Sequence, residues 1–128
     1  EFAIQNLNKI VEENEAKVVI CSSWRLGRSI KELQDILNSW GAKCEVIGVT
    51  PKKMSSTRGE EIWMWIRDNH SKVKAICILD DSLFDISPLL DEYCVHGIKG
   101  HHHGLRDIHI PLAKKCFETP FNIKRFKR

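Results

Sequence analysis

The sequence lacks the features that define several classes of protein. No apolar run is long enough to span a membrane, and the first residues show none of the pattern of a signal peptide. The five cysteines are odd in number, are spread along the chain and never form a C-x-x-C pair, which argues against a disulfide framework and against a zinc site. We therefore expect a soluble, cytoplasmic protein in a reducing compartment, with no membrane partner.

A large excess of charge of one sign is also absent. The formal net charge is +3, which is too small to indicate a nucleic-acid partner by itself. No internal repeat or low-complexity linker divides the 128 residues, and 42% of them are hydrophobic, so we expect one globular domain with its own core. We assign that domain to residues 1–120 and treat residues 121–128 as a basic tail. Basic and aromatic residues interleave in the tail, which suits nucleic-acid contacts, but a frayed terminus is the simpler interpretation.

The most informative stretch is an apolar run, residues 75–79, that ends in Asp80 and Asp81. A run that is apolar on both faces is typical of a strand in a parallel sheet covered by helices. Ligands of such sheets bind at the carboxyl ends of the strands, where these two carboxylates stand. Magnesium suits them, since it takes one or two carboxylates together with water and substrate phosphate. A turn with solvated carboxylates is the simpler alternative and explains the same two residues.

Strands and helices alternate along the sequence, which predicts an α/β fold, a Rossmann-like parallel sheet with helices on both faces. Two capping boxes, Ser29 with Glu32 and Thr57 with Glu60, mark the starts of two helices. The expected strands cover residues 17–21, 44–47, 75–79 and 93–95, and the expected helices cover 1–15, 29–40, a stretch that opens at 57, a short turn at 89–90, and 107–117.

Three polar residues stand where a phosphate could bind. Ser22 closes the first predicted strand as Asp80 closes the third, so both belong to the same edge of a parallel sheet. The serine hydroxyl and adjacent N–H groups can hold a phosphate oxygen, or can simply cap a turn. Arg58 falls in the first turn of a helix, where a cation is favourable if it binds an anion together with the helix end, and is otherwise a surface arginine. Arg25 is either a phosphate contact or the buried partner of a carboxylate.

Three consecutive histidines, His101, His102 and His103, suggest a metal site at first sight. Consecutive residues on a loop point in different directions, and no cysteine or glutamate cluster is near in sequence to complete a ligand set. A solvated loop is therefore the preferred interpretation of this stretch.

Taken in order, a strand that ends in a hydroxyl, a basic residue that opens a helix and an acidic pair that ends a strand resemble the haloacid dehalogenase (HAD) superfamily. The resemblance is closest to the HAD domain of Swiss-army-knife RNA repair proteins and its stand-alone relatives, and it covers the chain from Phe2 to about Phe117. The segments that carry it are Val18-Val19-Ile20-Cys21-Ser22-Ser23-Trp24-Arg25, Gly48-Val49-Thr50-Pro51, Arg58-Gly59-Glu60-Glu61-Ile62, Ile78-Leu79-Asp80-Asp81 and Gly104-Leu105.

The resemblance implies a magnesium-dependent phosphohydrolase that acts on phosphomonoesters, such as nucleic-acid ends or nucleotides, through an aspartyl-phosphate. Ser22 matches the second family motif, whose hydroxyl binds the transferring phosphoryl group, and Ser23 is the alternative if the register is shifted by one. Arg58 matches the third motif, a cation that neutralises phosphoryl charge. With Arg25, these residues form the expected phosphate-binding set.

The fourth family motif matches Asp80 and Asp81, which the resemblance implies as the residues that hold Mg²⁺. Of the two, we expect Asp81 to be the direct ligand, with Asp85 as a supporting acid. Phosphoryl transfer depends mostly on positioning and on charge neutralisation, and the groups in these motifs supply both.

One family motif is missing. The first motif, Asp-x-Asp at the end of a strand, supplies the nucleophile and the general acid/base, and it does not occur in this sequence. The family order places it before Glu1, on a central strand between the strands that end at Cys21 and Leu79. We interpret the sequence as a fragment of an active enzyme, because the other motif residues are intact, and we expect no turnover by this chain alone. The alternative is a non-catalytic phosphate- or RNA-binding module with the family fold.

Overall fold

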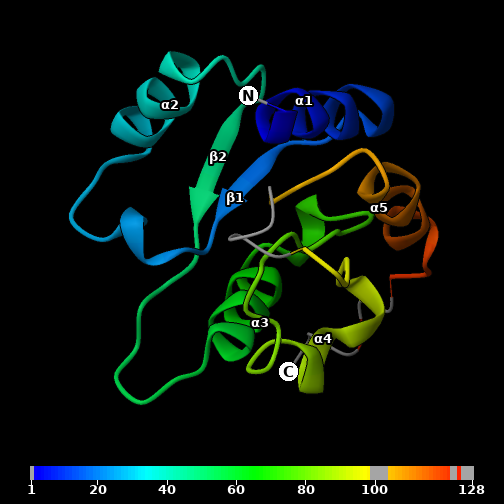
Figure 1. The fold of residues 1–128 in the computed structure, drawn as a ribbon. Coiled ribbons are helices and arrows are strands. Elements are labelled where there is room, and N and C mark those ends of the chain that lie inside the picture. Colours follow the sequence, from blue (N-terminus) through cyan, green and yellow to red (C-terminus); the bar gives the residue numbers. More distant parts are fainter. Residues whose placement is uncertain (1, 99–103, 122–123, 125–128) are drawn as a thin grey trace.

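The computed structural model describes residues 2–98, 104–121 and 124 and shows a mixed α/β fold (Figure 1). The α/β class and the parallel pairing expected from the sequence are confirmed. The helices are α1 (Phe2–Asn14), α2 (Ile30–Ser39), α3 (Arg58–Asp68), α4 (Ser87–Leu90) and α5 (His109–Glu118), the strands are β1 (Val18–Ile20) and β2 (Val46–Val49), and single 3-10 turns are η1 (Ser23–Arg25), η2 (His70–Lys72) and η3 (Asp91–Tyr93).

The sheet is smaller than the sequence predicts. β1 and β2 pair with each other in parallel. Residues 75–79 and 93–95, both predicted as strands, form no strand and share only one parallel bridge, between Ile78 and Cys94. A strand requires a continuous ladder of hydrogen bonds. Within the described residues β1 has no second partner strand and Ile78 pairs on one side only, so the segment that ends at the acidic pair stays extended without becoming a strand.

Three predicted boundaries are wrong by two residues, namely both ends of β2, which covers Val46–Val49, and the start of α5. β2 begins at Val46 because the side chain of Gln34 on α2 occupies the backbone groups at the expected start. The Gln34 Nε2 donates to the carbonyl of Cys44 at 2.8 Å, and its Oε1 accepts from the N–H of Val46 at 2.7 Å. α5 begins at His109 because the N–H of His109 first closes a turn onto the carbonyl of Arg106 at 3.0 Å.

Both predicted capping boxes are confirmed. On α2, the N–H of Glu32 donates to Ser29 Oγ at 3.1 Å, and the N–H of Ser29 donates to Glu32 Oε1 at 2.7 Å. On α3, the corresponding distances between Thr57 and Glu60 are 3.1 and 2.8 Å. The second box fixes the start of α3 at Arg58, so this arginine stands at a defined helix end.

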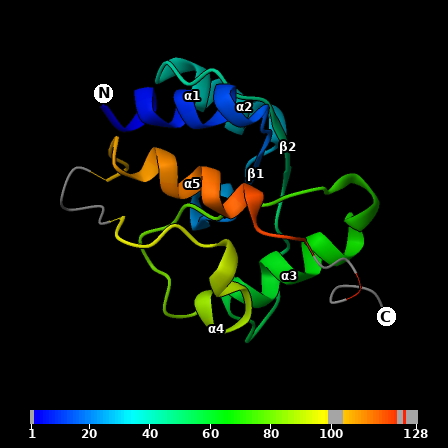
Figure 2. The ribbon, with the colours of Figure 1, turned by 90° about the vertical axis from the view of Figure 1, so that its right-hand side faces the viewer.

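Three clusters of apolar side chains hold the helices in place. α2 covers the strand pair, α1 lies beside α5 (Figure 2), and α3 packs against α4. The cluster around α3 includes Ile78, which holds the segment before Asp80 against this helix. The buried members include Leu33, Leu37 and Val46 under α2, Ile10 and Ala113 between α1 and α5, and Ile62, Ile66 and Leu90 around α3 and α4.

The histidine run, His101, His102 and His103, lies outside the described residues, as does most of the basic tail. All five cysteines fall within the described ranges and are free thiols. Across those same ranges, no helix combines the length and the apolar character that crossing a bilayer requires.

Candidate functional site

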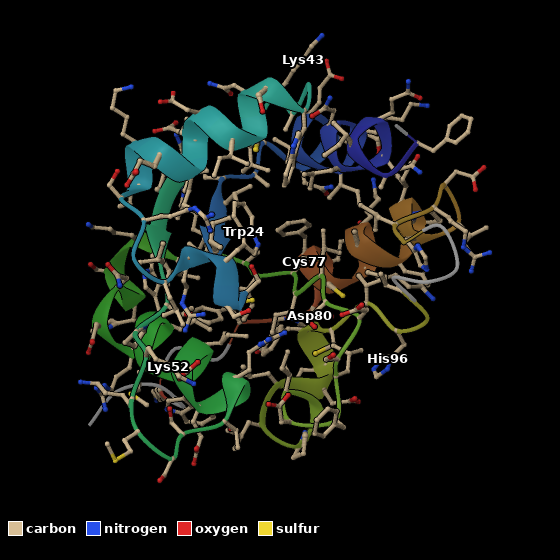
Figure 3. All side chains as sticks on the ribbon, turned by 60° about the vertical axis from the view of Figure 1, so that its left-hand side comes forward. Trp24, Lys43, Lys52, Cys77, Asp80 and His96 are labelled. Atoms are coloured by element: carbon tan, nitrogen blue, oxygen red, sulfur yellow. The ribbon has the colours of Figure 1, made fainter. Side chains whose placement is uncertain are left out.

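Three chain segments carry the predicted site residues, and two of these residues are in direct contact. Ser22 follows β1, Arg58 is the first residue of α3, and Asp80 follows the segment bridged at Ile78. The Nη1 of Arg58 donates to Oδ2 of Asp80 at 2.7 Å. In Figure 3 the side chain of Asp80 lies toward the middle of the molecule, whereas Lys43 extends at its outer edge. The third and fourth predicted motifs therefore meet in one place.

Asp80 is fully engaged by protein groups. Its side chain is 7% exposed, and its second oxygen, Oδ1, accepts the N–H of Ser82 at 2.7 Å. Burial lowers the pKa of Arg58, but the charge of Asp80 and the hydrogen bond to it outweigh burial and raise that pKa above its usual value. Arg58 is thus a permanent cation that Asp80 holds in position, and 27% of its side chain remains exposed to solvent.

Asp81 is exposed, and its Oδ1 accepts a long hydrogen bond, 3.5 Å, from the hydroxyl of Ser82. Within the described ranges, no three or more cysteine, histidine, aspartate or glutamate side chains lie close enough together to hold a metal ion. Magnesium does not need such a cluster, since it keeps several waters and takes one or two carboxylates together with substrate phosphate. The exposed carboxylate of Asp81 is a ligand of the type that magnesium accepts.

Asp85 docks the first turn of α3. Its Oδ2 accepts the N–H of Arg58 at 3.3 Å, and its carbonyl accepts the N–H of Gly59 at 3.1 Å. A carboxylate at a helix N-terminus satisfies a free donor and interacts favourably with the helix dipole. Gly59 permits this approach, because an added Cβ would lie 2.7 Å from the carbonyl oxygen of Asp85 and 3.0 Å from the Cα of Ile86. Asp85 therefore supports the site by fixing where Arg58 begins the helix.

The hydroxyl of Ser22 is buried and has no hydrogen-bond partner among the described residues. Ser22 has extended backbone, with φ −81° and ψ 161°, at the start of η1, yet its side chain does not cap that turn. The capping role left open by the sequence is therefore not the one that the structure shows. A buried hydroxyl without a partner is uncommon in native proteins and calls for a functional explanation. Ser23, the alternative, is exposed.

The thiol of Cys21, which directly follows β1, is affected by both charges of the Arg58–Asp80 ion pair. Burial is the main cause that raises the pKa of Cys21, and the charge of Asp80 raises it further. The charges of Arg58 and Arg25 act in the opposite direction, and the resulting pKa is about 11. Because Asp80 and Arg58 both act on this thiol, the residue that precedes Ser22 lies beside them.

The assignment of Arg25 to the phosphate-binding set is corrected by the structure. Its Nη2 donates to Oε1 of Glu61 at 3.1 Å, and the two side chains are 5% and 4% exposed. Its other N–H groups donate to backbone carbonyls. Of the two roles that the sequence leaves open, Arg25 takes that of the buried partner of a carboxylate, because its donors are already used.

A family model described as the HAD domain in Swiss Army Knife RNA repair proteins matches residues 1–108. The chain belongs to this family. The match includes the three segments that carry Ser22, Arg58 and Asp80. No curated protein and no solved structure gives a significant match to the chain.

Sequence reasoning assigns no role to three residues of this HAD domain, although they lie in the segments that carry the family resemblance. Gly59 has a signal in the sequence, since a glycine inside a helix costs up to about 1 kcal/mol relative to alanine and needs a reason. Glu61 directly precedes the buried Ile62 and is itself buried. Thr50 follows β2 as Ser22 follows β1, and its hydroxyl is likewise buried without a partner among the described residues.

Proposed function

We propose that this HAD domain serves a magnesium-dependent phosphohydrolase that acts on phosphomonoesters, with phosphate-ended nucleic acids or nucleotides as substrates. The main support is the Arg58–Asp80 ion pair, whose charges act on the thiol of Cys21, together with the buried hydroxyl of Ser22, the next residue in the chain. A cation, a hydroxyl donor and carboxylates that follow a strand, open a helix and end an extended segment suit a phosphoryl group. The family's link to RNA repair supports a nucleic-acid substrate.

In the proposed mechanism the chain's own residues bind and orient the phosphoryl group. The hydroxyl of Ser22 donates to a phosphoryl oxygen, and the exposed part of the Arg58 guanidinium neutralises its negative charge. Asp80 keeps that guanidinium in place at 2.7 Å, so little reorganisation is needed when charge develops. Positioning and charge neutralisation are the main protein contributions to phosphoryl transfer.

Magnesium would be held by Asp81, with Asp80 next to it in sequence. The exposure of the Asp81 carboxylate supports this choice, because it leaves room for a hydrated ion, whereas both oxygens of Asp80 are engaged by Arg58 and Ser82. A bound magnesium ion supplies positive charge next to the phosphate. Asp85 acts indirectly in this proposal, by fixing the position of Arg58.

The proposed chemistry requires an aspartate nucleophile, which in the family belongs to an Asp-x-Asp motif that this sequence does not contain. The sheet supports a position for a strand bearing that motif between β1 and residues 75–79. Within the described residues β1 has no second partner strand, and Ile78 pairs only with Cys94. The apolar side chains of Val19 and Cys77 stay partly exposed. We therefore expect no turnover by the 128-residue chain alone.

The decisive experiment measures phosphatase turnover with and without Mg²⁺. The substrates are p-nitrophenyl phosphate and an oligonucleotide with a terminal phosphate. The proteins are this chain and a version extended upstream to the native start codon. We expect turnover only in the extended version and its abolition by Asp81→Asn, since removal of even a supporting partner of a metal ligand costs about 10- to 100-fold. Asp35→Asn, which changes an exposed carboxylate on α2, is the matched control and should retain full activity.

Two other outcomes would redirect the assignment. Appreciable turnover by the 128-residue chain would contradict the requirement for an added strand. Silence in both versions would favour the non-catalytic module, provided that a phosphate-ended RNA binds regardless of Mg²⁺ and of Asp81→Asn, and with a steep dependence on salt.

A further inference from the structure

One buried guanidinium ties together the elements that carry the site. Arg25 lies in η1, just after β1, and its side chain is 5% exposed. An arginine has five N–H donors in a fixed planar fork, so it can join several chain segments at once. The acceptors are the carbonyls of Cys21 (Nη1, 3.0 Å), Ser22 (Nη1, 2.8 Å), Thr50 (Nε, 2.9 Å) and Pro51 (Nη2, 3.3 Å), and Oε1 of Glu61 (Nη2, 3.1 Å).

Glu61 extends these connections to the loop between β2 and α3. Its Oε2 accepts from the hydroxyl of Ser56 at 2.9 Å and from the N–H of Lys53 at 3.3 Å, and Lys52 Nζ lies 3.7 Å away. Burial raises the pKa of Glu61. The hydrogen bonds from Ser56 and Lys53 and the charges of Lys52 and Arg25 outweigh burial, so that the pKa is lower than usual. Glu61 is therefore a stable anion at neutral pH.

The pair connects the two proposed phosphate-binding residues. Arg58 precedes Glu61 by three residues on α3, so the position of Glu61 sets that of Arg58. The hydroxyl of Ser22 has no partner among the described residues, so its position depends on the backbone of Ser22. Arg25 holds that backbone through its carbonyl at 2.8 Å. The Arg25–Glu61 ion pair thus links the backbone of Ser22 to the helix that carries Arg58.

Building on the proposed function, we propose that Arg25 and Glu61 are positioning residues that set the Ser22 hydroxyl relative to the Arg58 guanidinium. A buried ion pair adds little net stability compared with apolar side chains of similar size. Its planar geometry, in contrast, fixes carbonyls from the ends of both strands in one arrangement. An apolar pair in the same place should keep the fold at a lower stability, since the carbonyls lose their donor, and should lose the phosphate site.

The test is an NMR titration of the 128-residue chain with inorganic phosphate in the presence of Mg²⁺, below the melting temperature of each variant. The variants are Arg25→Lys, Glu61→Gln and the double variant Arg25→Met with Glu61→Leu. We expect each to bind phosphate about tenfold more weakly or worse, as when a supporting partner of a ligand is removed. The double variant should melt below the wild type, because four backbone carbonyls lose Arg25 as their donor, and below its own melting temperature it should still bind phosphate weakly. The exposed pair Lys31 and Asp35, replaced by Met and Leu, is the control and should bind normally.

A second readout needs no substitution. In the wild-type chain, phosphate should shift the Nε–H resonance of Arg25 together with the amide of Ser22, although Arg25 does not contact the phosphate. An unmoved Arg25 resonance, or unchanged affinity in the variants, would overturn the positioning role and leave the proposed function intact. Failure of the wild-type chain to bind phosphate would overturn the inference for this chain, and would overturn the proposed function as well if the extended version also failed to bind phosphate and showed no turnover.

Discussion

Arg58 and Asp80 are 22 positions apart in the sequence, and their side chains meet at 2.7 Å. The contact joins the first residue of α3 to the segment bridged at Ile78. It also divides the acidic pair into two roles, since Asp80 is buried against Arg58 and Ser82 whereas Asp81 is exposed. The two carboxylates should therefore respond differently to substitution.

Asp80→Asn and Asp81→Asn should differ in their effects, the first acting mainly on stability and the second on metal binding. Asp80→Asn removes the charge from hydrogen bonds to Arg58 and Ser82, and we expect it to lower the free energy of unfolding by about 2 kcal/mol. Asp81→Asn should stay within about 0.5 kcal/mol of the wild type and should weaken Mg²⁺ binding. Denaturant unfolding and a magnesium titration measure the two effects. Equal loss of stability in both variants would contradict the division of roles.

Gly59→Ala should displace α3 from Asp85. The new methyl group would lie 2.7 Å from the carbonyl oxygen of Asp85, and the next nearest atoms, the Cα and the carbonyl oxygen of Ile86, are also backbone, which leaves little room for relief. We expect a loss of about 2 kcal/mol in the free energy of unfolding, as for other overpacked sites. Thermal unfolding checks this against Lys31→Ala, an exposed position on α2. A Gly59→Ala protein that is more stable than the wild type, as helix propensity alone would suggest, would contradict the close approach.

The pH dependence of stability should change when Glu61 is replaced by Gln. The pKa of Glu61 is lowered in the folded state, so the folded protein binds fewer protons there than the unfolded chain. The resulting stability is present above the unfolded value of 4.5 and is lost as the pH falls through the folded pKa. Glu61→Gln should therefore be less stable at neutral pH by about 3 kcal/mol, because Arg25 loses its charged partner, and should lose less on acidification. Urea unfolding between pH 7 and pH 3 tests this. An equally steep loss of stability with falling pH in Glu61→Gln and in the wild type would refute this prediction.

The thiol of Cys21 should react slowly and should report on Asp80. With a pKa of about 11, raised by burial and then by Asp80, almost all of this thiol is protonated at pH 8. Asp80→Asn removes one of the two causes, so alkylation of Cys21 by iodoacetamide should become several-fold faster. Cys44, whose pKa is raised by burial alone, is the internal control. Mass spectrometry after timed labelling gives both rates. If the alkylation rate of Cys21 does not change relative to that of Cys44, the charge of Asp80 does not act on the thiol at the end of β1.

Local sequence signals predict the parts of the fold that depend on neighbouring residues. The capping boxes at Ser29 and Thr57 form as expected, because each is closed by groups only three residues apart. They fix the starts of α2 and α3, and so the place of Arg58. The order of Ser22, Arg58 and the acidic pair also suffices for the family assignment, which the match over residues 1–108 confirms.

What the tertiary structure decides is which groups meet. The sequence leaves Arg25 between phosphate and carboxylate, and the distant Glu61 settles the choice by pairing with it in the core. Residues 75–79 have the pattern of a strand, yet a strand requires partners from elsewhere in the chain, and in the part of the chain that the structure describes Ile78 pairs with Cys94 alone. Gly59 acquires its role from the backbone of Asp85. Propensity and capping act within a few residues and can be read directly, whereas burial, pairing and close approach depend on segments that only the fold brings together.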